Sequence, residues 1–481
     1  MDLPRIPKGI NAENGTNSKN VMKNTISKKT LSGNFLSFSG NLLSFSGYCL
    51  LALIAIGVTE LRAQSNPSPG KAQSKAIWIT GATIHDGVRA PYPGLVGFSN
   101  GRIHYVGSGA EIRLDASNSE IINASGQHLY PGFIAPHTLL GLYEIEAVRA
   151  TRDHTETGSL NPQVHALIAY NTDSRIVPTV RNHGVLLAQI APEGGLISGR
   201  SAVVQLDAWN WEDACVKPQD GLFFNWPSMT NQSGRQAPST EEQEKSRQQT
   251  LDQLRQYLNE ARDYHKANPS TTKAKASPVN LKLAAAAGLW NGSTKVFVRV
   301  SEAKGMIAAV EFFKAWNLKP VLVGAEEADL LVDWLAKEKI DLVLGKVHRL
   351  PNRDGDPVYA AYTLPAELAK AGVRFCYSMD GAWNQRNLPY QAGHAVGFGL
   401  DTLKALQALT LDAAKILGID NRYGSIEEGK SATLFLSEGD ALDMRGNRPT
   451  HAFVDGRRVN LDDKQKVLYR KFSEKYDIPA K

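Results

Sequence analysis

Short runs of alternating apolar and polar residues, separated by Gly, Pro and Asn, occur near both ends of this 481-residue chain. The alternation predicts antiparallel strands with one buried face. The runs cover residues 77–80, 94–98, 102–106, 120–123, 432–436 and 452–454. Asp455-Gly456, directly after the last run, predicts a two-residue hairpin turn. We therefore expect one small β-sandwich domain assembled from residues 77–130 and 418–462.

The intervening residues 131–417 show a different pattern, in which short, almost wholly apolar runs alternate with helical periodicity. Expected strands are 184–190, 202–206, 295–300, 320–323, 341–344 and 373–377, and expected helices are 303–316, 325–337 and 401–417. Strands that are apolar on both faces and alternate with helices indicate a parallel sheet covered by helices. The number of units favours a (β/α)8 TIM barrel over an open sheet.

One insertion, at about residues 215–290, interrupts the barrel pattern. The capping box Ser239-Thr-Glu-Glu242 precedes a charged stretch in which apolar residues recur every three or four positions. This pattern predicts a surface helix over 241–266 with one buried stripe. Residues 463–481 are expected to form a C-terminal helix or tail.

The N-terminal region is typical of a secretory leader. The apolar stretch Tyr48–Val58 is followed by Ala63 and a polar segment, which predicts a signal within residues 1–63, cleavage after Ala63 and a linker over 64–76. No run of 18 apolar residues occurs, so no stable membrane span is expected after signal removal. The protein is then expected to be exported, to the periplasm or outside the cell. A buried core helix at 48–58 is the alternative.

Composition narrows the function classes. Apolar residues at 42% and charged residues at 21% are globular values. Residues 1–63 hold seven of the Lys and Arg side chains against three Asp and Glu, which accounts for most of the net charge of +6. The near-balanced remainder gives no basic surface for nucleic acid. The three cysteines are too few and too scattered for a disulfide framework or a zinc knuckle.

Four motifs follow one another in a known order. They are Pro131-Gly-Phe-Ile-Ala-Pro-His137-Thr-Leu139, residues 372–380 ending in Asp380, residues 405–418, and Gly424-Ser-Ile-Glu-Glu-Gly-Lys430-Ser-Ala-Thr-Leu. Together they resemble the amidohydrolase superfamily, and within it the imidazolonepropionase-like branch, over about residues 77–459. The resemblance implies a barrel enzyme that hydrolyses C–N bonds in cyclic amides or dipeptides.

The resemblance also implies a divalent metal, usually zinc, held by His-x-His on the first strand, by further imidazoles and by an Asp on the eighth strand. His137 and Asp380 match, and they are the expected catalytic residues. Leu139 stands at the second imidazole position, Arg299 at the strand-five position, and residues 321–324 offer no imidazole. Two ligands do not hold zinc tightly. We therefore expect no tightly bound cofactor, with His137, Asp380 and His348 as candidates for a weak site.

Further residues are expected around the same barrel mouth. Arg299 and Asp380 are predicted to form an ion pair in place of the metal. Trp209, near a strand end, and Arg386 and Asn387, after the eighth strand, are predicted with Arg299 to bind substrate.

Two functions remain open at this stage. One is an exported hydrolase acting on C–N bonds. The other is a catalytically inactive barrel that binds a small molecule or a short peptide at the same mouth. Neither the substrate nor the oligomeric state follows from the sequence.

Overall fold

The computed structural model describes residues 66–109, 112–268 and 279–479, which belong to one compact unit spanning residues 64–481. The predicted leader and its cleavage point lie outside the described residues. Among the helices within these ranges, none combines the length and apolar character needed to cross a membrane.

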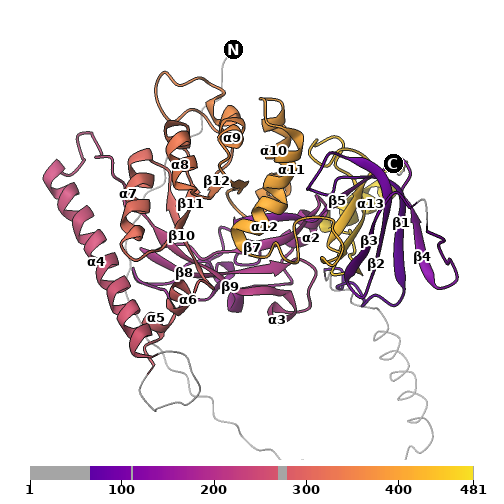
Figure 1. The fold of residues 1–481 in the computed structure, drawn as a ribbon, viewed down its shortest axis with the longest axis horizontal. Coiled ribbons are helices and arrows are strands. Elements are labelled where there is room, and N and C mark those ends of the chain that lie inside the picture. The colour runs from indigo at the N-terminus through magenta and orange to yellow at the C-terminus, as the bar shows by residue number, and fades with distance from the viewer. Residues whose placement is uncertain (1–65, 110–111, 269–278, 480–481) are drawn as a thin grey trace, which may run out of the picture. The chain divides into compact units, whose positions relative to one another are not determined.

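The expected composite β domain is confirmed as an eight-stranded sheet that takes strands from both ends of the chain (Figure 1). Its strands are β1 (Ala76–Ile84), β2 (Tyr92–Ser99), β3 (Arg102–Gly107), β4 (Ser119–Asn123), β5 (His128–Pro131), β14 (Leu434–Ser437), β15 (Pro449–Val454) and β16 (Arg457–Arg458). The two ends meet where β5 pairs antiparallel with β14, with Tyr130 opposite Phe435. Asp455 and Gly456 both have positive φ, at 47° and 74°, as the predicted hairpin turn requires.

A second eight-stranded sheet forms a nearly closed barrel, so the predicted architecture is confirmed. Its strands are β6 (Phe133–Thr138), β7 (Val185–Ile190), β8 (Ile197–Gln205), β9 (Cys215–Asn225), β10 (Lys295–Val300), β11 (Pro320–Gly324), β12 (Leu342–Leu344) and β13 (Phe375–Tyr377). They follow one another around the barrel in chain order, and β13 lies next to β6 without a hydrogen-bonded ladder in the described residues.

The third strand departs from the regular alternation. β8 runs antiparallel to both β7 and β9, whereas every other pair in this sheet is parallel. A parallel crossover needs a dozen or more residues, and the connections on either side of β8 are shorter than that. The chain can therefore only turn back on itself here. Consequently the start of β8 lies at the barrel mouth, and its end lies at the opposite, bottom end.

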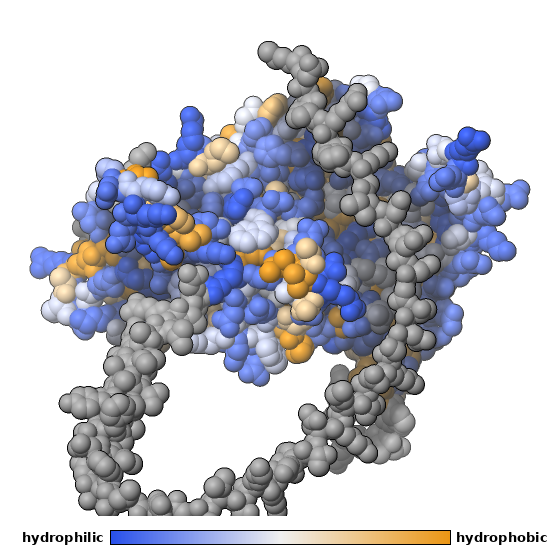
Figure 2. Space-filling view, turned by 180° about the vertical axis from the view of Figure 1, so that it is seen from behind, coloured by the Kyte–Doolittle hydropathy of each residue, from blue (hydrophilic) through white to orange (hydrophobic). Residues whose placement is uncertain are grey.

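Helices cover the outside of the barrel. They are α2 (Ile176–Arg181), α3 (Trp211–Ala214), α4 (Thr240–Ala267), α5 (Leu281–Ala284), α6 (Ala287–Asn291), α7 (Ala303–Lys314), α8 (Val332–Glu338), α9 (Ala360–Lys370), α10 (Leu388–Val396), α11 (Thr402–Leu409) and α12 (Leu411–Leu417), and α13 (Lys464–Lys475) follows the β domain. The predicted insertion helix is α4, which begins with the predicted capping box. On the face shown in Figure 2, hydrophilic side chains dominate and hydrophobic ones occur in small groups.

The expected helix over 401–417 is two helices. Thr410 separates α11 from α12 because its backbone, at φ −132° and ψ −92°, is not helical. The carbonyl groups at the end of α12 accept hydrogen bonds from Lys217 Nζ and Lys295 Nζ, on β9 and β10. Two lysine ammonium groups thus satisfy a helix C-terminus, where the helix dipole favours positive charge.

A buried ion pair joins the N-terminal segment, the barrel and the chain beyond the β domain. Arg181 Nη1 lies 2.6 Å from Asp207 Oδ1, and the two side chains are 4% and 0% exposed. The other carboxylate oxygen of Asp207 accepts from the backbone N–H of Gly70, and Arg181 Nη2 donates to the carbonyl of Asn460. Three distant parts of the sequence therefore depend on one pair of charges.

Replacing only one member of this pair should be costly. We expect Arg181→Met to lower the free energy of unfolding by roughly 3 to 5 kcal/mol, because Asp207 keeps a buried and unpaired charge. Adding Asp207→Asn should recover much of the loss. Urea unfolding of both variants measures the effect. Arg445→Met, in an exposed pair with Asp443, is the matched control and should change stability by less than about 1 kcal/mol. Equal effects of Arg181→Met and the control would contradict the prediction.

Candidate functional site

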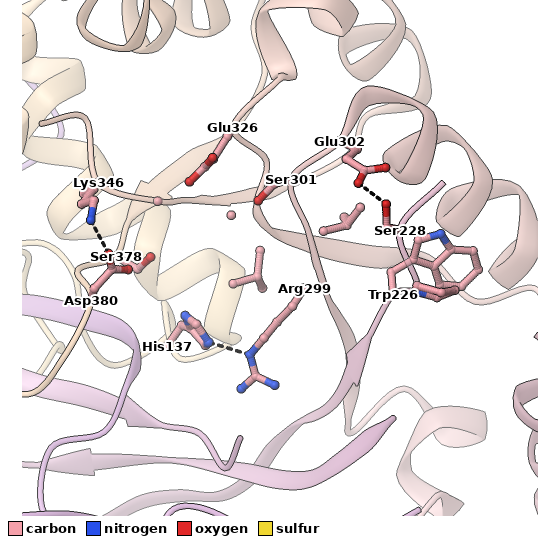
Figure 3. Close-up of a pocket in the computed structure, with 15 residues that line it drawn as sticks. His137, Trp226, Ser228, Arg299, Ser301, Glu302, Glu326, Lys346, Ser378 and Asp380 are labelled. Carbon is pink, nitrogen blue, oxygen red and sulfur yellow. Dashed lines mark hydrogen bonds and ion pairs between the residues drawn. The ribbon is translucent and has the colours of Figure 1, made fainter. Parts of the chain in front are cut away.

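A cavity of about 370 Å³ opens at the carboxyl ends of the barrel strands. Its walls come from the ends of β6, β10 and β11 and from the residues that directly follow β9, β12 and β13 (Figure 3). Binding sites in this type of barrel form at this end. Of the predicted site residues, His137, Arg299 and Asp380 line the cavity.

His137 lies at the end of β6 in a conformation that is unusual for a non-glycine residue, with φ at 49°. Its backbone N–H donates to Gln189 Oε1 at 2.9 Å, and its ring stacks on Phe223. Burial, with the nearby charge of Arg299, holds the pKa of His137 well below its usual range. The ring is therefore neutral at physiological pH, and its Nε2 accepts a hydrogen bond of 2.8 Å from Arg299 Nε.

Arg299, on β10, is surrounded by acceptors. Nη1 donates to Ser198 Oγ at 2.9 Å and to Asn225 Oδ1 at 3.2 Å, and Nη2 donates to the carbonyl of Pro192 at 2.6 Å. The guanidinium also lies over the ring of Phe223, 4.6 Å from its centre. Burial lowers the pKa of Arg299 to about 10, so the side chain remains a cation at neutral pH.

The prediction of an ion pair between Arg299 and Asp380 is wrong. Asp380 Oδ2 instead lies 2.8 Å from Lys346 Nζ, and both side chains are largely open to solvent, at 69% and 43% exposed. The hydrogen bond and the charge of Asp380 raise the pKa of Lys346. The physical reason for the difference is that Arg299 is turned toward the neutral acceptors of β8 and β9, whereas Asp380 has a nearer cation in Lys346, two residues after β12.

The arrangement does not fit a tightly bound metal ion. Within the described ranges, no three His, Cys, Asp or Glu side chains are grouped so that they could hold one. The Nε2 atom of His137 already accepts a hydrogen bond from a guanidinium, and a fixed cation beside it repels a second cation.

The other predicted residues lie away from this cavity. Trp209 lines a separate cavity of about 180 Å³ formed with residues 66–69 and α2. Its position follows from the direction of β8, since the end of an antiparallel strand lies at the bottom of the barrel. Arg386 and Asn387 belong to a short 3-10 helix after β13 and do not line the mouth. The Nδ1 atom of His348 lies 2.6 Å from Gln391 Nε2, outside the same cavity.

Four residues at the mouth were missed by sequence analysis, namely Trp226, Glu302, Glu326 and Lys346. Each comes one or two residues after a barrel strand. The carboxyl ends of parallel strands meet at one end of the barrel, so this position alone could have identified them.

The hydrogen bond between Arg299 and His137 should appear as a coupling in stability. Arg299→Met and His137→Phe remove the two ends of it, and the phenyl ring keeps the stacking on Phe223. We expect a coupling energy of about 1 to 2 kcal/mol between these substitutions, measured by urea unfolding of single and double variants. Arg299→Met and Asp380→Asn should instead be additive within about 0.5 kcal/mol. A large coupling in the second pair and none in the first would contradict the observed contacts.

Comparisons with known proteins agree with the fold. A model of the amidohydrolase family matches residues 361–459, which include β13 and Asp380. An amidohydrolase structure from Thermotoga maritima MSB8 is similar with a TM-score of 0.69 and 24% identity, covering 80% of this chain and 99% of that one. Molinate hydrolase is similar with a TM-score of 0.50 and 15% identity, covering 81% of this chain and 96% of that one. No curated protein matches the chain. The chain thus has the fold of the amidohydrolase superfamily, which confirms the predicted resemblance at the level of the superfamily. The imidazolonepropionase-like branch stays a prediction.

Proposed function

We propose that this protein binds a small amide-bearing molecule or a short peptide at the barrel mouth, without a resident metal ion. The single observation that carries the proposal is the hydrogen bond of 2.8 Å from Arg299 Nε to His137 Nε2. This hydrogen bond occupies the Nε2 atom of His137, the residue to which the family resemblance assigns a metal-binding role. The cavity itself has the size and the place expected of a small-molecule site.

The exposed polar groups of the mouth suit an amide. Lys346 Nζ can donate to a ligand carbonyl, and the Asp380 carboxylate can accept from a ligand N–H, because both groups are partly open to solvent. Trp226, at 9% exposed, provides an apolar wall on the opposite side of the cavity (Figure 3). Arg299 and His137 lie deeper and are committed to each other, so their part in this proposal is to keep the floor rigid.

Hydrolysis of a C–N bond is the second candidate function. It is favoured by the family match over residues 361–459, which contains the aspartate that the resemblance assigns as the base. In this case Asp380 takes a proton from water while the water oxygen bonds to the amide carbon. The C–N bond then breaks, and the proton passes from Asp380 to the leaving nitrogen, giving an amine and a carboxylic acid. Lys346, 2.8 Å from Asp380, would stabilise the negative charge that develops on the carbonyl oxygen.

Export is proposed together with either function. It is supported by the apolar stretch Tyr48–Val58 and the small residue Ala63 that follows it. Asn66 Nδ2 donates to the carbonyls of Asp173 and Ser174, so residue 66, close to the expected cleavage point, is fixed to the barrel.

The binding proposal predicts a metal-poor protein that still takes a ligand. Protein purified without chelator and supplied with zinc or manganese should retain well under one equivalent per chain, measured by elemental analysis. Alanyl-alanine amide, followed by calorimetry, should bind to this protein. Ser301→Trp should abolish binding by filling the cavity, and Ser246→Trp on the exposed part of α4 is the matched control.

Two results would change the conclusion. One equivalent of tightly held metal would overturn the metal-free proposal. Release of alanine from the probe, lost in Asp380→Asn by a factor of about 10² or more, would establish the second candidate in place of simple binding.

The export proposal predicts a mature N-terminus near Gln64, because a small-residue cleavage site follows the apolar stretch at that distance. Mass spectrometry of the processed protein measures it. Recovery of the chain with Met1 intact from the exported fraction would contradict the prediction.

A further inference from the structure

We infer that the ligand taken at the barrel mouth carries an ammonium group, and that the carboxylate of Glu326 receives it. The inference rests on the proposed binding function and names the charge of the ligand. Most charged side chains at the mouth already have hydrogen-bond or ion-pair partners within the described residues, whereas the carboxylate of Glu326 has none.

The two cations of the cavity are engaged. Arg299 donates to His137, Ser198, Asn225 and the carbonyl of Pro192. Lys346 lies 2.8 Å from Asp380. A ligand carboxylate could reach Arg299 only by displacing these acceptors, and it could reach Lys346 only in competition with Asp380.

One of the two remaining acids is also engaged. Glu302 accepts hydrogen bonds from the hydroxyl of Ser228 and from the backbone N–H groups of Met229 and Thr230. It therefore anchors the segment that follows β9. These donors are neutral, however, so the negative charge of Glu302 stays uncompensated beside the cavity.

Glu326 is different. Within the described parts of the chain, its carboxylate makes no hydrogen bond and no ion pair, although its backbone carbonyl accepts from Arg349. Figure 3 shows this carboxylate pointing into the space between Lys346 and Ser301. Its side chain is only partly buried, so a ligand can approach it from the cavity.

The charges of the mouth therefore do not balance. Glu302, Glu326 and Asp380 carry three negative charges, against the two positive charges of Lys346 and Arg299. An ammonium group on the ligand would compensate the excess and make a charge-assisted hydrogen bond to the free carboxylate. A ligand carboxylate would add to the repulsion. The chemical class that fits is an amide with a free amino group, such as an amino-acid amide or the amino end of a short peptide.

Three probes of similar size and different charge test the inference, by calorimetry at low ionic strength. Alanyl-alanine amide is a cation, N-acetyl-alanyl-alanine amide is neutral, and N-acetyl-alanyl-alanine is an anion. The cation should bind at least about tenfold more tightly than the neutral probe, since a hydrogen bond to a charged group is worth that factor or more. Added salt should lower the affinity of the cationic probe only.

Glu326→Gln should remove this preference by weakening the cation about tenfold, with the neutral probe unchanged. Glu474→Gln, on the exposed side of α13, is the matched control and should leave all three affinities as they are. Equal binding of the cationic and neutral probes in the unmodified protein would overturn the inference and leave the proposed function intact. Binding of none of the three would overturn both.

Discussion

A partly buried guanidinium at the end of the barrel needs hydrogen-bond acceptors from the segments around it. Arg299 is a cation in a poorly solvated position, and an unsatisfied charge there would cost several kcal/mol. The structure meets the requirement with acceptors that come from four different places in the sequence, namely the end of β6, the turn after β7, the start of β8 and the end of β9. One side chain thereby ties four strands together at the mouth.

The antiparallel strand β8 is what makes this arrangement possible. Because β8 starts at the mouth, Ser198 at its beginning can reach Arg299, while Ser201, three residues further along the strand, reaches into the barrel. There Ser201 Oγ and Gln189 Nε2 both donate to the carboxylate of Asp220, which is wholly buried and has a raised pKa for that reason. Gln189 in turn accepts from the backbone of His137. The position of His137 is thus fixed from below by a polar chain.

The sequence could predict what depends on local pattern. Alternation and turn residues located most strands of both sheets but not β5 or β9, and residues 215–225, which form β9, were wrongly expected to belong to the helical insertion. Asp455-Gly456 located a hairpin because the turn needs two successive residues with positive φ, a conformation that Asp and Gly adopt more readily than most residues. The direction of β8 was not predicted, because an apolar strand looks the same in either direction and only the lengths of its connections decide. For the same reason Trp209 was wrongly expected at the mouth, whereas it lies at the opposite end of the barrel.

Side-chain contacts across the barrel could not be predicted from the sequence pattern for another reason. Arg299 and His137 are 162 positions apart in the chain, and residue types alone do not say which of several acceptors a guanidinium will face. Matching charges suggested Asp380. Geometry decided otherwise, because Lys346 follows β12, which pairs with β13, the strand that leads to Asp380. Family resemblance identified His137 and Asp380 as residues of one cavity. It could not indicate that His137 would contact Arg299 while Asp380 would contact Lys346.

The cavity consequently has two layers, a floor and a rim, which differ in how well they tolerate substitution. The floor is made of groups whose hydrogen bonds are directed at one another, so substitution there disturbs several strands at once. The rim is made of Glu302, Glu326, Lys346 and Asp380, each on a segment that follows a strand and therefore free to change without loss of the barrel. Since Arg299 cannot leave the floor as a metal ion could, its charge is constant, and the balance of charge at the mouth is left to the rim and to whatever binds there.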